Sequence, residues 1–442
     1  MASVDAVRIV RDVLGDGAVA AGEAAGAFAV DGQVPQCVAY PETMDALSRC
    51  AAALHGGGLA VIPAGNGSHL HIGRPPRAYD VALSTRRMCR VVAHEAADLT
   101  VTVEAGCTLA DLNDVLASAG QFLPLDPPHP EQRTVGSIIA TDAWGPWRLE
   151  HGKVRDLLIG VTVVLASGTV VRGGGRVVKN VAGYDLMKLF AGSFGTLGIV
   201  VEATFKVRPQ PAHTAVLVVP VDSVAKGTTL GLAAVDGPLA PQFVDVVNAA
   251  AGAQLELNGP ALVVGCAGVM AEVDVQHQRM RTLPGVGDVR RVDAEEARQL
   301  YTALRDLPAD AGDVTGGEGG AAVLGCALSV VPSRLADVLQ RAEDEAARHR
   351  VELQVRAAVG VGTASVRCLG VTEEGAVRLA EWLGEATRAA AGWIRFDVLP
   401  TAWKARIDPW GAAPPGVALM RGVKRTLDPE ARLSPGRFVG GI

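Results

Sequence analysis

Three glycines at a three-residue spacing, Gly192, Gly195 and Gly198, stand directly before the apolar-rich run 199–207. Because glycine has no Cβ, such a backbone can turn sharply or approach a flat ligand closely. The rough alternation of apolar and polar residues after the glycines predicts a strand at a sheet edge or facing a ligand. A tight helix-to-strand turn packed in a core would give the same pattern, so this run alone does not separate the two interpretations.

A second glycine segment lies upstream, where the apolar residues 59–62 lead into Pro63-Ala64-Gly65-Asn66-Gly67-Ser68. Consecutive backbone amides in such a turn can form a concave nest for an anion, and the Ser68 hydroxyl adds a donor. No Lys or Arg precedes Arg74 here, so backbone dipoles would neutralise a phosphate. The segment lacks the Gly-Lys-Ser/Thr of a P-loop and the G-x-G-x-x-G of a Rossmann fold. A simple hairpin turn is the alternative.

A third segment, 134–145, is rich in small residues and follows the proline-rich stretch 124–130. The fixed φ of proline excludes regular helix or central strand from that stretch. The small residues suggest a backbone that lies close against something flat; they are Gly136, Ser137, Ala140 and Thr141. Three such loops in order, each flanked by strands, are more specific together than any one alone.

The order and spacing of these segments resemble the FAD-binding domain shared by relatives of vanillyl-alcohol oxidase and p-cresol methylhydroxylase. The resemblance is strongest to the FAD-binding E-type subunits of bacterial glycolate oxidase. It covers about residues 35–210, and the ending 427–437 repeats the family pattern weakly. Four runs carry it: 63–68 with 73–75, 120–129, 154–157 and 179–198.

The resemblance implies a site for non-covalent FAD. Residues Pro63, Ala64, Gly65, Asn66, Gly67 and Ser68 would wrap the pyrophosphate. Thr134, Gly136, Ser137, Ala140 and Thr141 would line the diphosphate and the ribityl chain, and Gly198 and Ile199 would add backbone contacts. The histidine that relatives use for covalent attachment matches Ser68, so His69 and His71 are not expected to form that bond.

Four positions depart from the family pattern. Ala64 stands where an Arg or Lys is common, and Ser137 replaces the second glycine of a Gly-Gly pair. Asp142 replaces an Asn, and Phe194 replaces the Glu of Gly-Ser-Glu-Gly. These departures bear on the tightness of FAD binding and on direct catalysis.

No general base can be named from the sequence. His129, between prolines, could face the flavin and polarise a substrate, although an exposed loop histidine fits equally. Arg437 could engage a carboxylate, because a guanidinium offers a bidentate fork. Surface solvation is the alternative for Arg437 and its basic neighbours Lys404, Arg406 and Lys424.

The fold class expected is α+β, with a two-part FAD-binding domain of the p-cresol methylhydroxylase type and an α+β cap domain with an antiparallel sheet. We expect an N-terminal segment at 1–34, the FAD-binding domain at 35–210, the cap at 211–400 and a return to the first domain at 401–442. Gly312–Gly320 is expected to be a flexible loop. Expected helices are 44–55, one beginning at Thr108, 294–305, 334–348 and 373–390; expected strands are 60–62, 91–93, 99–104, 158–166, 169–172, 215–221, 261–268, 322–331, 351–359 and 364–371.

Composition excludes several other classes. The net charge is −6 and no Lys/Arg block marks a nucleic-acid partner. No apolar run reaches the roughly 18–20 residues of a spanning helix, and the start does not resemble a signal peptide. We therefore expect a cytoplasmic protein, with any membrane association made through a partner. The seven cysteines are scattered without a C-x-x-C pair, which argues against disulfides and against a zinc or iron–sulfur site in this chain.

By resemblance, the chain is expected to be the FAD-binding subunit of a glycolate oxidase or related 2-hydroxy-acid dehydrogenase complex. Flavin would oxidise glycolate to glyoxylate, and a second flavoprotein subunit and an iron–sulfur subunit would be its partners. One alternative is a stand-alone FAD-dependent dehydrogenase of D-lactate or another hydroxy acid. The other is a non-catalytic scaffold subunit that has lost FAD, an idea motivated by Ala64.

Overall fold

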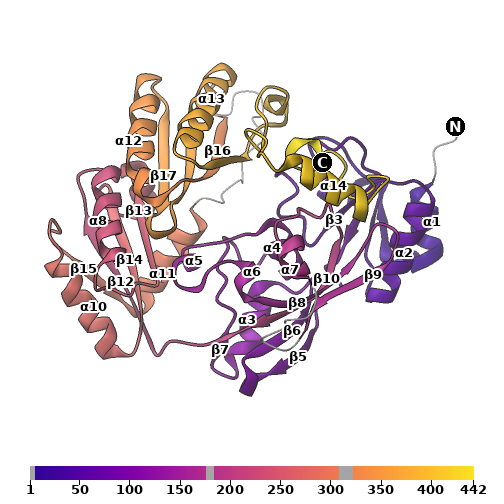
Figure 1. Cartoon of the computed structure of the whole chain (residues 1–442). Coiled ribbons are helices and arrows are strands. Elements are labelled where there is room, and N and C mark those ends of the chain that lie inside the picture. The colour runs from indigo at the N-terminus through magenta and orange to yellow at the C-terminus, as the bar shows by residue number, and fades with distance from the viewer. Residues whose placement is uncertain (1–4, 176–183, 308–321) are drawn as a thin grey trace. The chain divides into compact units, whose positions relative to one another are not determined.

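The computed structural model describes residues 5–175, 184–307 and 322–442, and these divide into two compact units (Figure 1). The first unit comprises residues 1–144, 153–210 and 413–442, and the second comprises 145–152 and 211–412. The run 179–183 of the fourth family motif and the expected loop Gly312–Gly320 lie outside the described residues.

A four-stranded sheet begins the first unit, with strand order β1-β2-β4-β3. β1 pairs antiparallel with β2, whereas β4 runs parallel to both β2 and β3. Helices α1 (Ala6–Leu14) and α2 (Met44–Gly56) pack their apolar sides into the core of this sheet. The strands are β1 (Val19–Ala21), β2 (Cys37–Ala39), β3 (Val61–Ala64) and β4 (Val81–Ser84).

The second sheet of this unit is antiparallel and has the order β5-β6-β10-β8-β9. Its central strand is β10 (Ile199–Lys206), the run that follows the three glycines. Of the two alternatives expected for this run, the sheet edge was wrong: β10 pairs with a strand on each side, and most of its side chains are buried. The other strands are β5 (Val91–Glu95), β6 (Thr100–Glu104), β8 (Leu158–Val164) and β9 (Val170–Gly174).

Helix starts in this unit follow the capping pattern in the sequence. Thr43 caps α2 by accepting from the amide of Ala46, and Thr108 caps α3 (Leu109–Ala117) by accepting from the amide of Asp111. α3 packs with α4 on the five-stranded sheet. The remaining elements of the unit are α4 (Val135–Thr141), α6 (Val154–Leu157), α7 (Leu186–Phe190), α14 (Val417–Leu427) and the short strand pair β7 (Gln121–Phe122) with β11 (Arg208–Pro209).

An eight-stranded antiparallel sheet forms the second unit, as the sequence predicted, with the order β15-β12-β14-β13-β17-β18-β16-β19. Five of its strands lie where they were expected: β12 (His213–Pro220), β14 (Ala261–Gly268), β16 (Val323–Ser329), β17 (Glu352–Ala358) and β18 (Thr363–Leu369). Three further strands were not expected from the sequence: β13 (Phe243–Val247), β15 (Arg290–Asp293) and β19 (Trp393–Val398).

Helices pack on this sheet unevenly. α8 (Val224–Asp236), α10 (Met270–Thr282), α12 (Pro332–Arg348) and α13 (Glu373–Ala389) contribute to the large core on one face. On the other face, α9 (Ala249–Gln254) and α11 (Ala294–Asp306) pack against β12, β13, β14 and β15. No helix of 18 or more described residues is apolar enough to cross a membrane.

The segment 145–152, with α5 (Arg148–His151), leaves the first unit and packs into the second. The Trp147 ring stacks on Tyr301 at 5.3 Å between centroids. A Cβ placed on Gly360 would come within 2.6 Å of Leu149. At the other end, residues 401–412 stay with the second unit because Trp403 and Ile407 belong to its core, so the return to the first unit starts at Ala413 instead of the expected 401.

A buried ion pair holds the C-terminal segment in the first unit. Lys424 is 5 % exposed, and its Nζ donates to Asp428 Oδ2 at 2.6 Å, to the Thr196 carbonyl at 2.7 Å and to the Leu433 carbonyl at 2.8 Å. Asp428 in turn accepts from the amides of Arg432 and Leu433. Burial lowers the pKa of Lys424, and the neighbouring Asp428 carboxylate opposes that shift.

We expect Lys424→Met to lower the free energy of unfolding by about 3–5 kcal/mol, because it leaves Asp428 buried without its countercharge. Urea unfolding followed by circular dichroism measures the change. Lys188→Met is the matched control, since Lys188 pairs with Asp185 at a site where its side chain is 58 % exposed. Equal stability of the two variants would show that the buried pair does not hold the segment.

The seven cysteines are free, and six of them are buried. Burial raises the pKa of Cys37 to about 11 and that of Cys107 to about 11. Cys89 alone is exposed among them.

The native protein should therefore present one rapidly reacting thiol, since thiol reagents attack the exposed thiolate. Titration with an aromatic disulfide reagent counts the reactive thiols at neutral pH. Cys89→Ser should remove the fast phase, and Cys37→Ser should leave it intact. A fast phase that survives Cys89→Ser would contradict the burial of the other six.

Candidate functional site

The predicted pyrophosphate loop, Gly65 to Ser68, begins where β3 ends at Ala64. The Ser84 hydroxyl donates to the Gly65 carbonyl at 2.8 Å, and the Thr85 amide donates to the Ala64 carbonyl at 2.9 Å. These bonds fix the loop to the end of β4. Gly67 has a φ of +86°, which L residues with side chains rarely adopt.

Two amides of this loop are open to an anion. Among the described residues, no backbone carbonyl accepts from the amides of Asn66 or Gly67. Backbone N–H groups are obligatory donors, so a phosphate oxygen is a fitting partner. The assignment of this loop to the pyrophosphate of FAD, without a basic side chain at Ala64, stays a prediction.

The loop packs directly on the start of α4. A Cβ on Gly65 would lie 2.1 Å from Thr134 Oγ1, a separation that real atoms do not tolerate. The segment before Thr134 is bonded to the same loop, because Asn66 Nδ2 donates to the Gln132 carbonyl at 3.3 Å and Arg133 Nη1 donates to the Ser68 carbonyl at 2.8 Å. Arg133 was not predicted from the sequence, because it belongs to no motif.

Residues 135–141 form the helix α4, which corrects the expectation of a third loop flanked by strands. Thr134 caps the helix by accepting from the Ser137 amide at 3.3 Å. A Cβ on Gly136 would lie 2.9 Å from that of Ala105, so the glycine lets the helix approach the end of β6. Gly136 therefore serves the packing of a helix. The interpretation of 134–145 as a loop between strands did not include that role.

The hydroxyls along α4 bond to its own backbone. Ser137 Oγ donates to the Thr134 carbonyl at 2.8 Å, and Thr141 Oγ1 donates to the Ser137 carbonyl at 2.7 Å. Each hydroxyl oxygen retains acceptor capacity for a ligand hydroxyl. The assignment of Ser137, Ala140 and Thr141 to the ribityl chain stays a prediction.

The turn that contains Gly192 and Gly195, after α7, contacts the end of α4. The Gly192 amide donates to the Ile139 carbonyl at 2.9 Å, and the Phe194 amide donates to the Ala140 carbonyl at 2.8 Å. A Cβ on Gly195 would lie 3.3 Å from the Pro63 ring. Gly192 and Gly195 both have positive φ, so their turn, the end of α4 and the end of β3 converge in the first unit.

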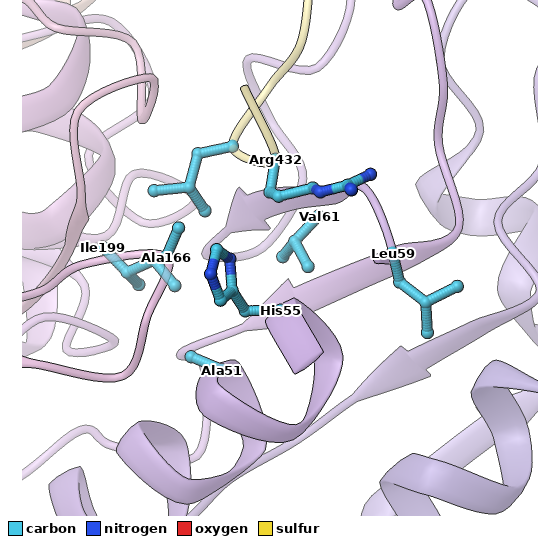
Figure 2. Close-up of a pocket in the computed structure, with 8 residues that line it drawn as sticks. Ala51, His55, Leu59, Val61, Ala166, Ile199 and Arg432 are labelled. Atoms are coloured by element: carbon cyan, nitrogen blue, oxygen red, sulfur yellow. The ribbon is translucent and has the colours of Figure 1, made fainter. Parts of the chain in front are cut away.

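Gly198 and Ile199 are placed differently. A Cβ on Gly198 would lie 2.3 Å from Val163, on the neighbouring strand β8. The Ile199 side chain is 1 % exposed and lines a small pocket with His55 and Arg432 (Figure 2). Figure 2 shows the His55 ring pointing toward Ala166 and Ile199. Only the backbone of these two residues could therefore serve a cofactor, which is the role that the resemblance implies.

The two catalytic candidates, His129 and Arg437, differ in their surroundings. His129 has a φ of +53°, and its Nδ1 lies 3.6 Å from Glu131 Oε1 in the segment before Thr134. Arg437 is 8 % exposed and donates to the carbonyls of Leu70 at 2.5 Å and Ile72 at 2.6 Å. Burial lowers the pKa of Arg437 to about 10, while Asp31 opposes that shift. Their catalytic assignment stays a prediction.

Asp142, one of the departures from the family pattern, ends α4 with a φ of +49°. Its Oδ2 accepts from Lys153 Nζ at 3.1 Å, while its Oδ1 is buried with no partner in the structure. The charge introduced at this position is thus balanced by Lys153. Sequence inspection could not pair the two, because nothing in an eleven-residue separation indicates contact.

Comparison with known proteins agrees with this geometry. Residues 35–174 match the family described as the FAD binding domain, and residues 210–394 and 409–438 match the C-terminal domain of FAD-linked oxidases. The chain belongs to the FAD-linked oxidase family. Its cofactor is FAD, as the sequence predicted, and the enzyme is an oxidoreductase.

This FAD-linked oxidase is 27 % identical to glycolate oxidase subunit GlcD of Bacillus subtilis, over 92 % of this chain and 89 % of that one. It is 38 % identical to glycolate oxidase subunit GlcE of Escherichia coli, over 33 % of this chain and 42 % of the relative. It is also 36 % identical to the cytochrome-dependent D-lactate dehydrogenase 1 of Saccharomyces cerevisiae, over 43 % of this chain. The last two matches span less than half of those relatives, 42 % and 33 %.

Solved structures confirm the fold expected from the sequence. The structure of p-cresol methylhydroxylase with substrate bound matches with a TM-score of 0.77 at 16 % identity, over 98 % of this chain and 96 % of that one. An alkyldihydroxyacetonephosphate synthase matches with a TM-score of 0.72 at 16 % identity, over 97 % of this chain and 84 % of that one. At these identities the likeness concerns the fold alone.

We expect Gly65→Ala to weaken FAD binding at least tenfold, because the added methyl would displace Thr134 and with it the start of α4. Titration of the apoprotein with FAD, followed by quenching of flavin fluorescence, gives the dissociation constant. Gly26→Ala is the control, since nothing lies within 4 Å of a Cβ there. Wild-type affinity in Gly65→Ala, with an unchanged circular dichroism spectrum, would contradict the placement of the phosphate loop.

Proposed function

We propose that this FAD-linked oxidase is the FAD-binding subunit of a 2-hydroxy-acid dehydrogenase complex of the glycolate oxidase type. The observation that carries the proposal is the match to a glycolate oxidase subunit along nearly the whole chain. The match to a second subunit with the same activity in its name, at 38 % identity over 148 residues, supports it. The substrate proposed is glycolate, and the product is glyoxylate.

The oxidation removes two electrons and two protons from the CH–OH group of the substrate, and FAD accepts the hydride equivalent when bound. The residues of the chain hold and orient the cofactor. The Gly65–Ser68 loop presents its amides to the pyrophosphate, and α4 stands beside it. His129 is our candidate for the group near the reacting hydroxyl, because it lies in the segment bonded to the loop through Arg133.

The proposed partners are a second flavoprotein subunit and an iron–sulfur subunit, which would take electrons from the reduced flavin. Support for the complex comes from the names of the two relatives, each of which is a subunit. The sequence adds that none of the seven cysteines lies in a C-x-x-C pair, the usual arrangement for holding a cluster.

A second candidate is a stand-alone D-lactate dehydrogenase. Several relatives carry that name, including one from Archaeoglobus fulgidus at 35 % identity over 37 % of this chain. These matches cover less of the chain than the glycolate oxidase subunit does, so we rank this candidate second.

We expect the purified FAD-loaded chain to show flavin absorption, with the flavin released by acid, and to be bleached anaerobically by glycolate faster than by D-lactate. Stopped-flow absorption at the flavin band measures both rates. Faster bleaching by D-lactate, with turnover in the absence of other subunits, would favour the second candidate. A folded protein that takes up no FAD would instead support the alternative of a non-catalytic scaffold subunit.

A further inference from the structure

A segment near the N-terminus packs on one face of the four-stranded sheet. The match to the FAD binding domain begins at residue 35, and residues 22–33, which we term the strap, precede it. Helices α1 and α2 cover the opposite face of the sheet. The strap contributes three buried apolar residues to a separate cluster, in which they pack with side chains of β2, β3 and β4; the three are Ala25, Phe28 and Val30. The strap is therefore held against the strand that leads into the pyrophosphate loop.

Polar contacts fix the strap in addition to its apolar side chains. The Tyr79 hydroxyl donates to the Phe28 carbonyl at 2.8 Å, and both residues are buried. Gln33 Nε2 donates to the Pro76 carbonyl at 2.8 Å. The Phe28 ring also meets the Tyr40 ring edge-on, with 6.3 Å between the ring centroids. The backbone and the ring of Phe28 are thus both held by neighbours in the first unit.

The strap contacts the pyrophosphate loop at Gly67. The point that a Cβ of Gly67 would occupy lies 3.8 Å from Phe28 Cε1, 3.9 Å from the Ala27 carbonyl oxygen and 3.5 Å from Leu70 Cδ1. These are ordinary packing distances, so the strap and Leu70 together form a wall on one side of the glycine. Gly67 has a φ of +86° and no side chain with which to hold that conformation. Its neighbours must therefore hold it.

This wall supports the part of the loop that offers donors to an anion. Asn66 and Gly67 carry the two amides from which no backbone carbonyl of the described residues accepts. Glycine loses more conformational freedom than any other residue when it is ordered, so an unsupported Gly67 would have to be ordered by the ligand itself. A loop that is already ordered before the ligand arrives binds it more tightly, because less conformational entropy is lost on binding.

We propose that the strap orders the pyrophosphate loop in advance of FAD binding, and that Phe28 is the positioning residue through which it does so. Phe28 acts through Gly67 and has no need to touch the cofactor. Its effect falls on the phosphate half of FAD, because the strap contacts the loop that the sequence assigns to the pyrophosphate. The inference concerns the cofactor, and it does not depend on which 2-hydroxy acid the enzyme oxidises.

We expect Phe28→Leu to weaken FAD binding by about tenfold, because leucine keeps an apolar side chain in the cluster but lacks the ring edge that contacts Gly67. Tyr79→Phe should weaken binding by a smaller factor, since it removes only the hydrogen bond to the Phe28 carbonyl. Tyr40→Phe is the matched control, because Tyr40 lies in the same cluster and its hydroxyl makes no hydrogen bond to the strap among the described residues. Titration of the apoprotein with FAD, followed by flavin fluorescence, gives the dissociation constants.

Phosphorus NMR of the FAD-loaded protein separates a role in positioning the pyrophosphate from a general loosening of the fold. The phosphorus resonances of bound FAD should shift in Phe28→Leu, while the flavin absorption bands stay those of the wild type. Tyr40→Phe should leave both the resonances and the bands unchanged.

The inference is overturned if folded Phe28→Leu binds FAD as the wild type does, or if its flavin bands move while the phosphorus resonances stay in place. Equal FAD affinity of Tyr79→Phe and Tyr40→Phe would also overturn it, because the bond to the Phe28 carbonyl would then have no effect on the loop. If Phe28→Leu does not fold, this comparison decides the question. Failure of every 2-hydroxy acid to reduce the flavin would refute the proposed function and leave the role of the strap intact.

Discussion

The buried contact between Lys424 and Asp428 determines where the end of the chain lies, and much of the first unit depends on it. A lysine ammonium that is nearly inaccessible to water requires acceptors for all its protons, and here it has three. One acceptor is the Thr196 carbonyl, in the turn whose Gly195 touches Pro63. The C-terminal segment, the glycine turn and the end of β3 are therefore tied by one cation. Arg437 adds a second tie, to the residues that follow the phosphate loop.

Close backbone approach is the other constraint on the cofactor region. At Gly65 and Gly136 the chain comes so near to Thr134 and Ala105 that a methyl group would not fit. Close packing of this kind lets short loops hold their backbone amides in fixed positions. The phosphate loop is thus organised by packing and by bonds to Ser84 and Arg133.

The sequence predicted the parts of this structure that depend on local chemistry. Thr43 and Thr108 marked helix starts because a hydroxyl before an apolar run caps the first amides, and alternating apolar residues located most strands of the second unit. The sequence did not predict the features that depend on contacts between residues far apart in the chain. β10 looked like an edge strand, but its polar residues lie between β6 and β8, where Thr204 bonds Thr102. The small residues of α4 suggested a loop. Their actual role, a close approach to Ala105, is a tertiary contact that the sequence does not reveal. For the same reason Arg133 and the Asp142–Lys153 pair became apparent only once strands and loops were assembled.

The path of the chain between the units has a consequence for how the protein is made. The first unit is interrupted twice, and its last 30 residues are synthesised after the whole of the second unit. Lys424 follows Thr196 by 228 residues, so the glycine turn has this partner only after the whole of the second unit has been synthesised. The second unit needs only Trp147 and its neighbours from earlier in the chain. Order of synthesis therefore favours a protein whose central portion matures first and whose cofactor half is completed last.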